Sequence, residues 1–286
     1  MTWMESIEYA VAYIEKHITD NIKPEEIAKA VNISYFYFQK GFTMLCGYTI
    51  GEYIRNRRLA LAGTDLATGS EKVIDIALKY GYSSPDSFTK AFTRFHGVTP
   101  IQVRNQGAML KSFAPLRIKI SLEGGYLMDY KIEKKEAFYV LANARTFDYE
   151  NVQEEVPKFW QEHFSTGKGQ FICGSMGINV AEINGDTFEY LIADECDTNI
   201  DVPEGFEVRM IPKLTWAIFP CKGSMPESMQ KTNTTIFSEW LPGNKEFEFA
   251  AGYCIEYYDD PTKYEKGIMD EEYYSELWIP VKRVDK

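Results

Sequence analysis

The first feature of this chain is a set of side chains suited to contact with DNA bases. The outward-facing members of the set are Tyr35, Phe36, Gln39 and Lys40. In the major groove, a glutamine pairs with an adenine edge, a lysine with guanine or phosphate, and an apolar ring with the thymine methyl group. Gln39 and Phe36 are therefore candidates for base contact and Lys40 for contact with guanine or phosphate, at about 1–3 kcal/mol of discrimination for each base-specific contact.

The elements that position these side chains occur twice, about 50 residues apart. Each copy has a short amphipathic helix, a tight polar turn and a second helix, and the copies span residues 24–42 and 73–95. This arrangement is typical of helix-turn-helix units. Two such units on one chain can read two successive major-groove segments of double-stranded DNA without a dimer.

Phenylalanines at helical spacing separate the buried side of each second helix from its outer side. Phe38 and Phe42 lie four residues apart, and Phe88, Phe92 and Phe95 follow at intervals of four and three. This spacing predicts one buried face in each helix. The residues left on the outer face of the second copy are Asp86, Ser87, Thr89, Lys90 and Thr93.

A helix of about 17 residues, starting near Thr49, is expected between the copies. Its length of about 25 Å suits a spacer between two recognition helices one DNA turn apart. The helix carries a basic cluster of Arg55, Arg57 and Arg58. This cluster is either a solvated helix face or a contact to the phosphate backbone.

Charge is divided unevenly along the 286 residues, whose net charge is −11. Residues 1–112 hold 13 basic and 11 acidic side chains, and residues 34–112 within them hold 10 basic and 5 acidic ones. The remainder has a net charge of −13. The first part can therefore approach phosphates, whereas the second part repels them.

Composition disfavours several other classes of protein. No apolar run approaches 18 residues, and the first residues lack the pattern of a signal peptide. Five scattered cysteines and three histidines show no metal-ligand spacing, so we expect reduced thiols, no metal and no cofactor. The expected location is the cytoplasm, in association with the nucleoid and not with a membrane.

The second copy resembles the signature of the AraC/XylS family of transcription regulators. The resemblance rests on residues 81–100, where Gly-Tyr opens the turn and Gly-Val-Thr-Pro follows the helix, with Ile76 and Ala77 upstream. The N-terminal position of the module is similar to the MarA, SoxS and Rob subgroup. The resemblance implies contact with RNA polymerase, usually as an activator.

This resemblance also implies base- or phosphate-facing roles for Asp86, Thr89 and Lys90. The family often has arginine where this chain has Lys40 and Lys90, and lysine lacks the bidentate fork, so guanine readout is expected to be less stringent. The full set of expected DNA contacts is Tyr35, Phe36, Gln39, Lys40, Arg55, Asp86, Thr89, Lys90 and Thr93.

The composition changes after a connector, and the chain is predicted to divide into residues 1–108, a linker at 109–126 and residues 127–286. Strand-turn-strand patterns at 130–141 and 206–219 each lead into a helix and further strands. The predicted fold is thus an all-α tandem helix-turn-helix domain followed by a pseudo-symmetric α+β domain with a concave surface between its halves.

The second domain resembles the GyrI-like effector-binding domains known from BmrR and from the C-terminal part of Rob. The resemblance rests on residues 236–242, 255–259 and 275–281, the last reading Ser-Glu-Leu-Trp-Ile-Pro-Val. It implies a pocket in which a buried glutamate attracts cations and aromatic walls stack on planar ligands. A small aromatic or cationic effector is therefore expected.

Strand alternation places Glu276 and Trp278 on one face, and Glu276 is the first candidate for the pocket acid, with a structural or solvated role as the alternative. Glu256 and Tyr258 share a face and are the second candidates. The remaining candidates, for which core packing is an equal alternative, are Trp216, Phe138 and Trp160.

These features predict a ligand-responsive DNA-binding regulator and not an enzyme, since no Ser-His-Asp, Cys-His or metal constellation is visible. Three alternatives remain for the second domain. It sequesters drugs, it hydrolyses substrates with Glu276 and Tyr258 activating water, or it binds a protein partner.

Overall fold

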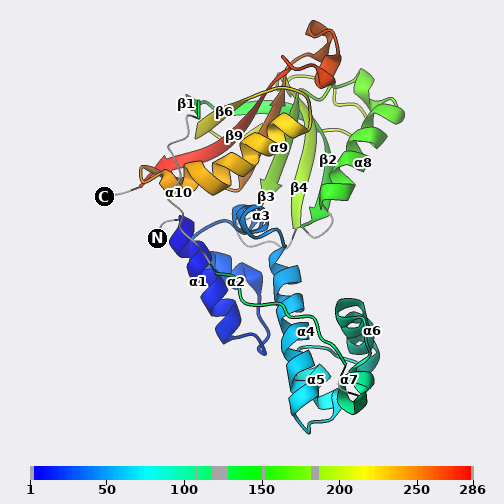
Figure 1. Cartoon of the computed structure of the whole chain (residues 1–286). Coiled ribbons are helices and arrows are strands. Elements are labelled where there is room, and N and C mark those ends of the chain that lie inside the picture. Colours follow the sequence, from blue (N-terminus) through cyan, green and yellow to red (C-terminus); the bar gives the residue numbers. More distant parts are fainter. Residues whose placement is uncertain (1–2, 107, 118–127, 150–151, 182–186, 285–286) are drawn as a thin grey trace.

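The computed structural model describes residues 3–106, 108–117, 128–149, 152–181 and 187–284. A helical unit forms the first part of the chain, and an antiparallel sheet with helices on one face forms the second (Figure 1). The helices of the first part are α1 (Trp3–Lys16), α2 (Pro24–Ala30), α3 (Tyr35–Cys46), α4 (Ile50–Thr68), α5 (Val73–Lys79), α6 (Pro85–His96) and α7 (Pro100–Gln106). None of the helices in the described ranges is long and apolar enough to cross a membrane.

Both predicted helix-turn-helix units are present, as α2–α3 and α5–α6. Ser34 and Ser84 occupy the N-caps of α3 and α6, where each hydroxyl accepts a hydrogen bond from a backbone N–H. Gly47 and Gly97 end the same helices at φ of 73° and 82°, in the left-handed region that glycine adopts without strain. The sequence repeat is therefore also a repeat of the residues that start and stop the helices.

The predicted phenylalanine faces pack as expected. Phe38, Phe42, Phe88 and Phe92 are completely buried, and Phe95 is partly buried beside them. Burying a large side chain of this kind stabilises the fold by about 1.5–3 kcal/mol. Phe88 and Phe92 belong to a separate cluster of the second unit, whereas Phe38 and Phe42 belong to the main core, which continues into the sheet.

Helix α4 begins after Thr49, as predicted. Thr49 and Glu52 form a capping box, with Glu52 N donating to Thr49 Oγ1 at 3.1 Å and Thr49 N donating to Glu52 Oε2 at 2.9 Å. Its 19 residues span about 28 Å. The helix carries α5, α6 and α7 away from the sheet, so the two units lie at opposite ends of the helical part (Figure 1).

Within the described residues, the second part contains nine strands and the helices that cover them. The strands are β1 (Lys131–Lys135), β2 (Phe138–Asp148), β3 (Met176–Ala181), β4 (Thr187–Cys196), β5 (Glu207–Ile211), β6 (Leu214–Lys222), β7 (Phe247–Phe249), β8 (Tyr253–Tyr258) and β9 (Tyr274–Arg283). The longer helices are α8 (Val152–Ser165) and α9 (Glu227–Thr235), and a π-helical turn (Ile236–Trp240) joins α9 to the short α10 (Leu241–Gly243).

The two predicted halves are confirmed. One runs β1-β2-α8-β3-β4 and the other β5-β6-α9-β8-β9, with β7 added at the side of β9. The strand order is β1-β6-β9-β8-β3-β4-β2-β5. Strands β1 and β2 lie at opposite ends of that order but are joined only by residues 136–137. Strands β5 and β6 also lie at opposite ends and are joined only by residues 212–213. The sheet therefore curls back on itself.

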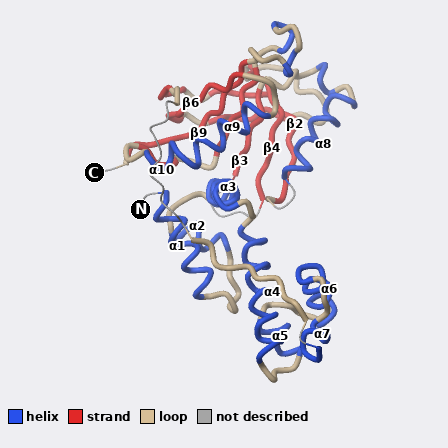
Figure 2. The backbone as a smooth tube through the Cα atoms, viewed as in Figure 1, coloured by secondary structure: helices blue, strands red, loops and turns tan. Residues whose placement is uncertain are grey.

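Curling gives the sheet an inner face and a helix-covered face. The cluster on the inner face consists only of strand residues and includes Trp216, Trp278, Ile178 and Ile255. Helices α8 and α9 lie on the other face (Figure 2). The inner face is therefore filled by side chains of the strands themselves.

The predicted linker has no regular structure where the structure describes it. Residues 108–117 are neither helix nor strand, and Phe113 and Leu116 pack at the edge of the core. Residues 118–126 of the predicted linker lie outside the described residues.

Candidate DNA interface and effector cleft

Helix α6 presents part of the predicted DNA-contacting set to solvent. Asp86, Ser87 and Lys90 are exposed, whereas Thr89 and Thr93 are half-buried. In the described chain, α6 contacts α4, α5 and α7, all within the helical unit. The outer face of this recognition helix is therefore accessible to DNA.

Helix α3 differs, because the sheet covers the face that was expected to point outward. Tyr35 and Phe36 are each only 5% exposed and Gln39 is 8% exposed. Figure 1 shows α3 end-on, directly below the sheet. The expectation of an outer, accessible face on α3 is wrong for this conformation, since aromatic residues of the second part bury it.

Tyr37 makes the tightest contact between α3 and the sheet. Its hydroxyl donates a hydrogen bond to the carbonyl oxygen of Tyr253, and its ring stacks on Phe249 with centroids 4.0 Å apart at 12°. Tyr37 is completely buried, and burial raises its pKa well above the ordinary value. It is therefore a neutral donor that fixes α3 to β8.

The base-reading candidates on α3 take part in the same packing. The Phe36 ring lies 6.0 Å from Phe188 of β4, and Lys40 Nζ donates to Cys254 Sγ of β8 at 3.6 Å. Gln39 is held inside the helical unit, donating to the Tyr35 hydroxyl and accepting from Ile50 N at 3.5 Å. None of these groups faces solvent as a DNA-reading side chain does.

The arginine cluster on α4 divides between surface and structural roles. Arg55 is exposed and 3.9 Å from Glu52, so it is available to a phosphate. Arg57 is buried against Glu15, with Nη2–Oε2 and Nε–Oε1 distances of 2.7 Å and 2.8 Å, and Arg58 donates to the carbonyl oxygens of Ile18 and Asp20. Arg57 and Arg58 therefore form neither a solvated helix face nor a phosphate contact in this structure.

The effector candidates do not form one group. Strand pairing sets Glu256 opposite Leu277 and Tyr257 opposite Glu276. Paired residues share a face and neighbours alternate, so the two glutamates lie on opposite faces of the sheet. Glu276, Trp278, Trp216 and Phe138 belong to the inner face, whereas Glu256, Tyr258 and Trp160 belong to the helix-covered face.

On the inner face, the partners of Glu276 are already in place. Tyr274 donates to Oε1 and Trp278 Nε1 donates to Oε2, both at 2.6 Å, and Lys131 Nζ lies 3.9 Å away. Lys135 Nζ lies 4.6 Å from the Trp278 ring centre. Glu276 is 8% exposed, and this geometry matches the structural alternative for its role.

On the helix-covered face, Glu256 has donors but no cation. The hydroxyls of Tyr190 and Tyr258 both donate to Oε2, at 2.9 Å and 2.8 Å, and Trp160 Nε1 donates to the Tyr190 hydroxyl at 3.1 Å. Among the described residues no basic side chain pairs with Glu256, which is half-buried. A Cβ on Gly177 would lie 3.1 Å from Glu256 Oε2, so glycine keeps this space open.

Both tyrosines are held as neutral donors beside this carboxylate. Burial, with the Glu256 charge as the second cause, raises the pKa of Tyr190 and of Tyr258 well above the ordinary value. Tyr190 was missed by the sequence reasoning. Alternation along β4 gives its face, but only the position of β3 between β4 and β8 brings it to Glu256.

The contact surface of α3 and the Glu256 cluster share the helix-covered face. Cys254, which Lys40 contacts, is two residues before Glu256 on β8, and Phe188, which Phe36 contacts, is two residues before Tyr190 on β4. Residues two apart on a strand lie on one face about 7 Å apart. The two sites are therefore immediate neighbours.

The pairing of Glu276 with Tyr258 to activate water is contradicted. Tyr258 is opposite Ser275 and lies on the helix-covered face, whereas Glu276 lies on the inner face. General acid-base catalysis needs the two groups within reach of one substrate. The backbone of the sheet separates them.

Comparisons with known proteins agree with both parts. A sequence profile described as "Integron-associated effector binding protein" (Cass2) matches residues 131–281, and a "Helix-turn-helix domain" profile matches residues 27–106. The tandem units and the curled sheet thus define a DNA-binding transcription regulator of the AraC type with an effector-binding domain. The chain belongs to the Cass2 family of effector binding proteins.

Individual relatives match one part each. Regulatory protein SoxS of Escherichia coli K12 is 34% identical over 106 residues, which are 37% of this chain and 99% of SoxS. The transcriptional activator AarP of Providencia stuartii is 36% identical over 94 residues, 33% of this chain and 70% of AarP. The structure of SAV2435 bound to tetraphenylphosphonium has 19% identity and a TM-score of 0.48, over 54% of this chain and 94% of that one.

We expect Lys90→Ala to weaken DNA binding and to lower the slope of log affinity against log salt by about 1, because one phosphate or guanine contact is lost. The measurement is a fluorescence-anisotropy titration of a labelled duplex at several salt concentrations. Lys79→Ala is the control, since Lys79 is paired with Asp65 at 2.8 Å. Equal slopes in Lys90→Ala and the unaltered protein would contradict the role of α6.

Proposed function

We propose that the chain is a transcription regulator in which an aromatic cation bound at Glu256 releases α3 for binding to DNA. The observation that carries the proposal is the shared helix-covered face. Lys40 and Phe36 of α3 pack beside Cys254 and Phe188, and the next residues on the same face are Glu256 and Tyr190.

The ligand class follows from the groups around Glu256. Its Oε2 accepts from two tyrosines, while Oε1 has no hydrogen-bond donor among the described residues. The Trp160 ring lies 5.6 Å from Tyr258 at 88°, so aromatic surfaces flank the carboxylate. A cation over such a ring gains about 0.5–2 kcal/mol when it is desolvated. We therefore propose a small aromatic cation as the effector.

The proposed switch has a docked and a released state. In the docked state α6 is accessible and the outer face of α3 is covered, so one recognition helix is available to DNA. A cation at Glu256 repels the Lys40 ammonium next to it and competes for the same face. It therefore favours the released state, in which both units reach successive major grooves.

The proposal keeps the roles and the domain boundaries that the sequence predicts. Residues 1–108 bind DNA, 109–126 connect, and 127–286 bind the effector. The α3 contacts with DNA are made only after release, and those of α6 and Arg55 in both states. Contact with RNA polymerase, which the family resemblance implies, belongs to the DNA-bound form.

The test is DNA affinity with and without a permanent aromatic cation. The full chain first selects a duplex from a randomised library, and its affinity is then measured with tetraphenylphosphonium or with neutral triphenylphosphine oxide. We expect the cation alone to tighten binding about fivefold or more, within the usual range of coupling between sites. By linkage, the duplex then tightens binding of the cation by the same factor. An unchanged or weakened DNA affinity would refute the switch.

A further inference from the structure

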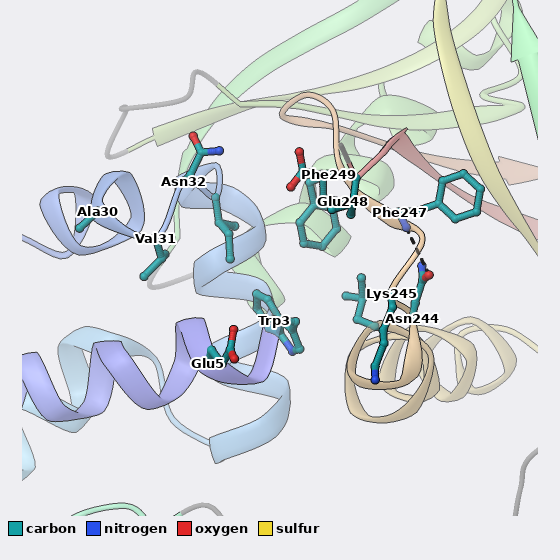
Figure 3. A pocket seen from close by; sticks show the side chains of 13 residues that line it. Trp3, Glu5, Ala30, Val31, Asn32, Asn244, Lys245, Phe247, Glu248 and Phe249 are labelled. Carbon is teal, nitrogen blue, oxygen red and sulfur yellow. Dashed lines mark hydrogen bonds between the residues drawn. The ribbon is translucent and has the colours of Figure 1, made fainter. Parts of the chain in front are cut away.

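We infer a second small-molecule site, for an amphipathic aryl carboxylate, in the cavity between the first helix-turn-helix unit and the sheet domain. The cavity has a volume of about 420 Å³, within the range of small-molecule sites. Figure 3 shows its lining side chains, which come from α1, the α2–α3 turn, α10 and β7. It is separate from the Glu256 cluster, none of whose residues line it.

The walls suit a flat apolar body. Trp3, Phe247 and Phe249 contribute aromatic side chains to the lining, and Val31 and Ile33 of the turn contribute aliphatic ones. The Trp3 and Phe249 rings lie 6.2 Å apart at 86°. These two rings are in edge-to-face contact, so a ligand ring would pack beside this pair and not between its members.

Two of the polar groups of the cavity are buried donors without a partner. Trp3 Nε1 and Asn244 Nδ2 are buried and have no acceptor among the described residues. The orientation of the Asn244 amide is fixed, since its Oδ1 accepts from Glu246 N at 2.9 Å and from Phe247 N at 3.3 Å. Buried N–H donors normally have hydrogen-bond acceptors, so we expect a ligand to supply an acceptor group for these two donors.

The charges at the rim favour an anion. Lys245 lines the cavity and has no ion-pair partner in the described chain. Two glutamates also line it, but Glu248 is paired with Lys282 at 3.0 Å and Glu5 is not free of partners either. A carboxylate accepts from both an N–H donor and an ammonium, and such charge-assisted bonds are stronger than neutral ones. The ligand is thus an aromatic ring system with one carboxylate.

The binding test uses 2-naphthoate and its cationic counterpart, 2-naphthylmethylammonium, with the full chain in a calorimeter. We expect 2-naphthoate to bind at one site, at least tenfold more tightly than the ammonium.

Asn244→Asp keeps the acceptor for Glu246 N and Phe247 N but removes the donor, and Lys245→Gln removes the charge. Each is expected to weaken 2-naphthoate binding about tenfold, and Glu256→Gln to leave it unchanged. Lys245 is at the surface, so its variant retains the fold. No saturable binding at millimolar concentration, or equal affinity in both cavity variants, would overturn the site.

The direction of regulation rests on the proposed function. The cavity is lined from both the turn and the sheet domain, so it is complete only while α3 is docked. A ligand that binds the docked state stabilises it, and we expect 2-naphthoate to weaken DNA binding. If 2-naphthoate binds with the expected variant pattern and DNA affinity does not change, the docking switch fails and the site stands. If 2-naphthoate does not bind but tetraphenylphosphonium tightens DNA binding, the site fails and the switch stands.

Discussion

Gly41→Ala is expected to raise DNA affinity about tenfold without any effector. Gly41 lies on α3 where the rings of Trp3 of α1 and Phe237 of the sheet domain meet the helix. An added Cβ would lie 2.8 Å from Phe237 Cδ1 and closer still to Trp3, so the Trp3 ring must turn aside as well when α3 leaves the sheet. Overpacking of this kind costs about 1–3 kcal/mol, and 1.4 kcal/mol corresponds to tenfold in an equilibrium constant. Alanine also favours the helix itself by about 0.5–1 kcal/mol, so α3 remains intact when it leaves the sheet.

Gly243→Ala is the matched control for this variant. Gly243 lies in α10, and no other atom comes within 4 Å of a Cβ placed there. Anisotropy titrations compare the two variants with the unaltered chain, and urea unfolding verifies that each is folded. If folded Gly41→Ala binds DNA as the unaltered protein does, α3 is not held back by the sheet and the switch is wrong.

Glu256→Gln is expected to lower the affinity for tetraphenylphosphonium at least tenfold and to leave triphenylphosphine oxide unaffected. Glutamine can still accept from Tyr190 and Tyr258, so the variant removes the charge while the hydrogen bonds remain. Loss of a partly desolvated charge interaction costs about 1.5–3 kcal/mol. Trp160 lies beside the cluster, which makes tryptophan fluorescence a suitable measurement.

The Glu276→Gln variant distinguishes the role of Glu276 from that of Glu256. The Glu276 carboxylate lies on the other face and is already bonded to Tyr274 and Trp278. We expect this variant to change cation affinity by less than about threefold while lowering the free energy of unfolding, since a charge-assisted hydrogen bond is replaced by a neutral one. The opposite ranking, with Glu276→Gln abolishing cation binding, would move the effector site to the inner face.

Most of the architecture was predictable from local sequence signals. The repeat of capping serines and closing glycines marks α3 and α6, and the phenylalanine spacing gives their buried faces. Alternation in 275–281 correctly placed Glu276 and Trp278 together on one face of β9. These signals act within one element, over a few residues, and so the sequence displays them directly.

The grouping of candidate residues was less predictable, because it depends on which strands are neighbours. Glu256 and Glu276 look equivalent in sequence, each on a strand with aromatic residues. The β8–β9 register pairs Tyr257, and not Glu256, with Glu276. Because neighbouring residues on a strand point to opposite faces, the two carboxylates lie on opposite faces of the sheet. Tyr190 reaches Glu256 only because β3 lies between β4 and β8, with glycine at position 177.

The sequence by itself determined two helix-turn-helix units, a long helix between them, and two strand-strand-helix-strand-strand halves, because caps and periodicity are local properties. Tertiary structure decided which recognition helix is accessible and which glutamate lacks a cation. Contacts such as Tyr37 with Tyr253 and Lys40 with Cys254 join residues more than 200 positions apart, and they depend on packing between α3 and the sheet. The outer face of α3 has the same residue types whether it meets DNA or the sheet, so only the packed structure distinguishes these partners.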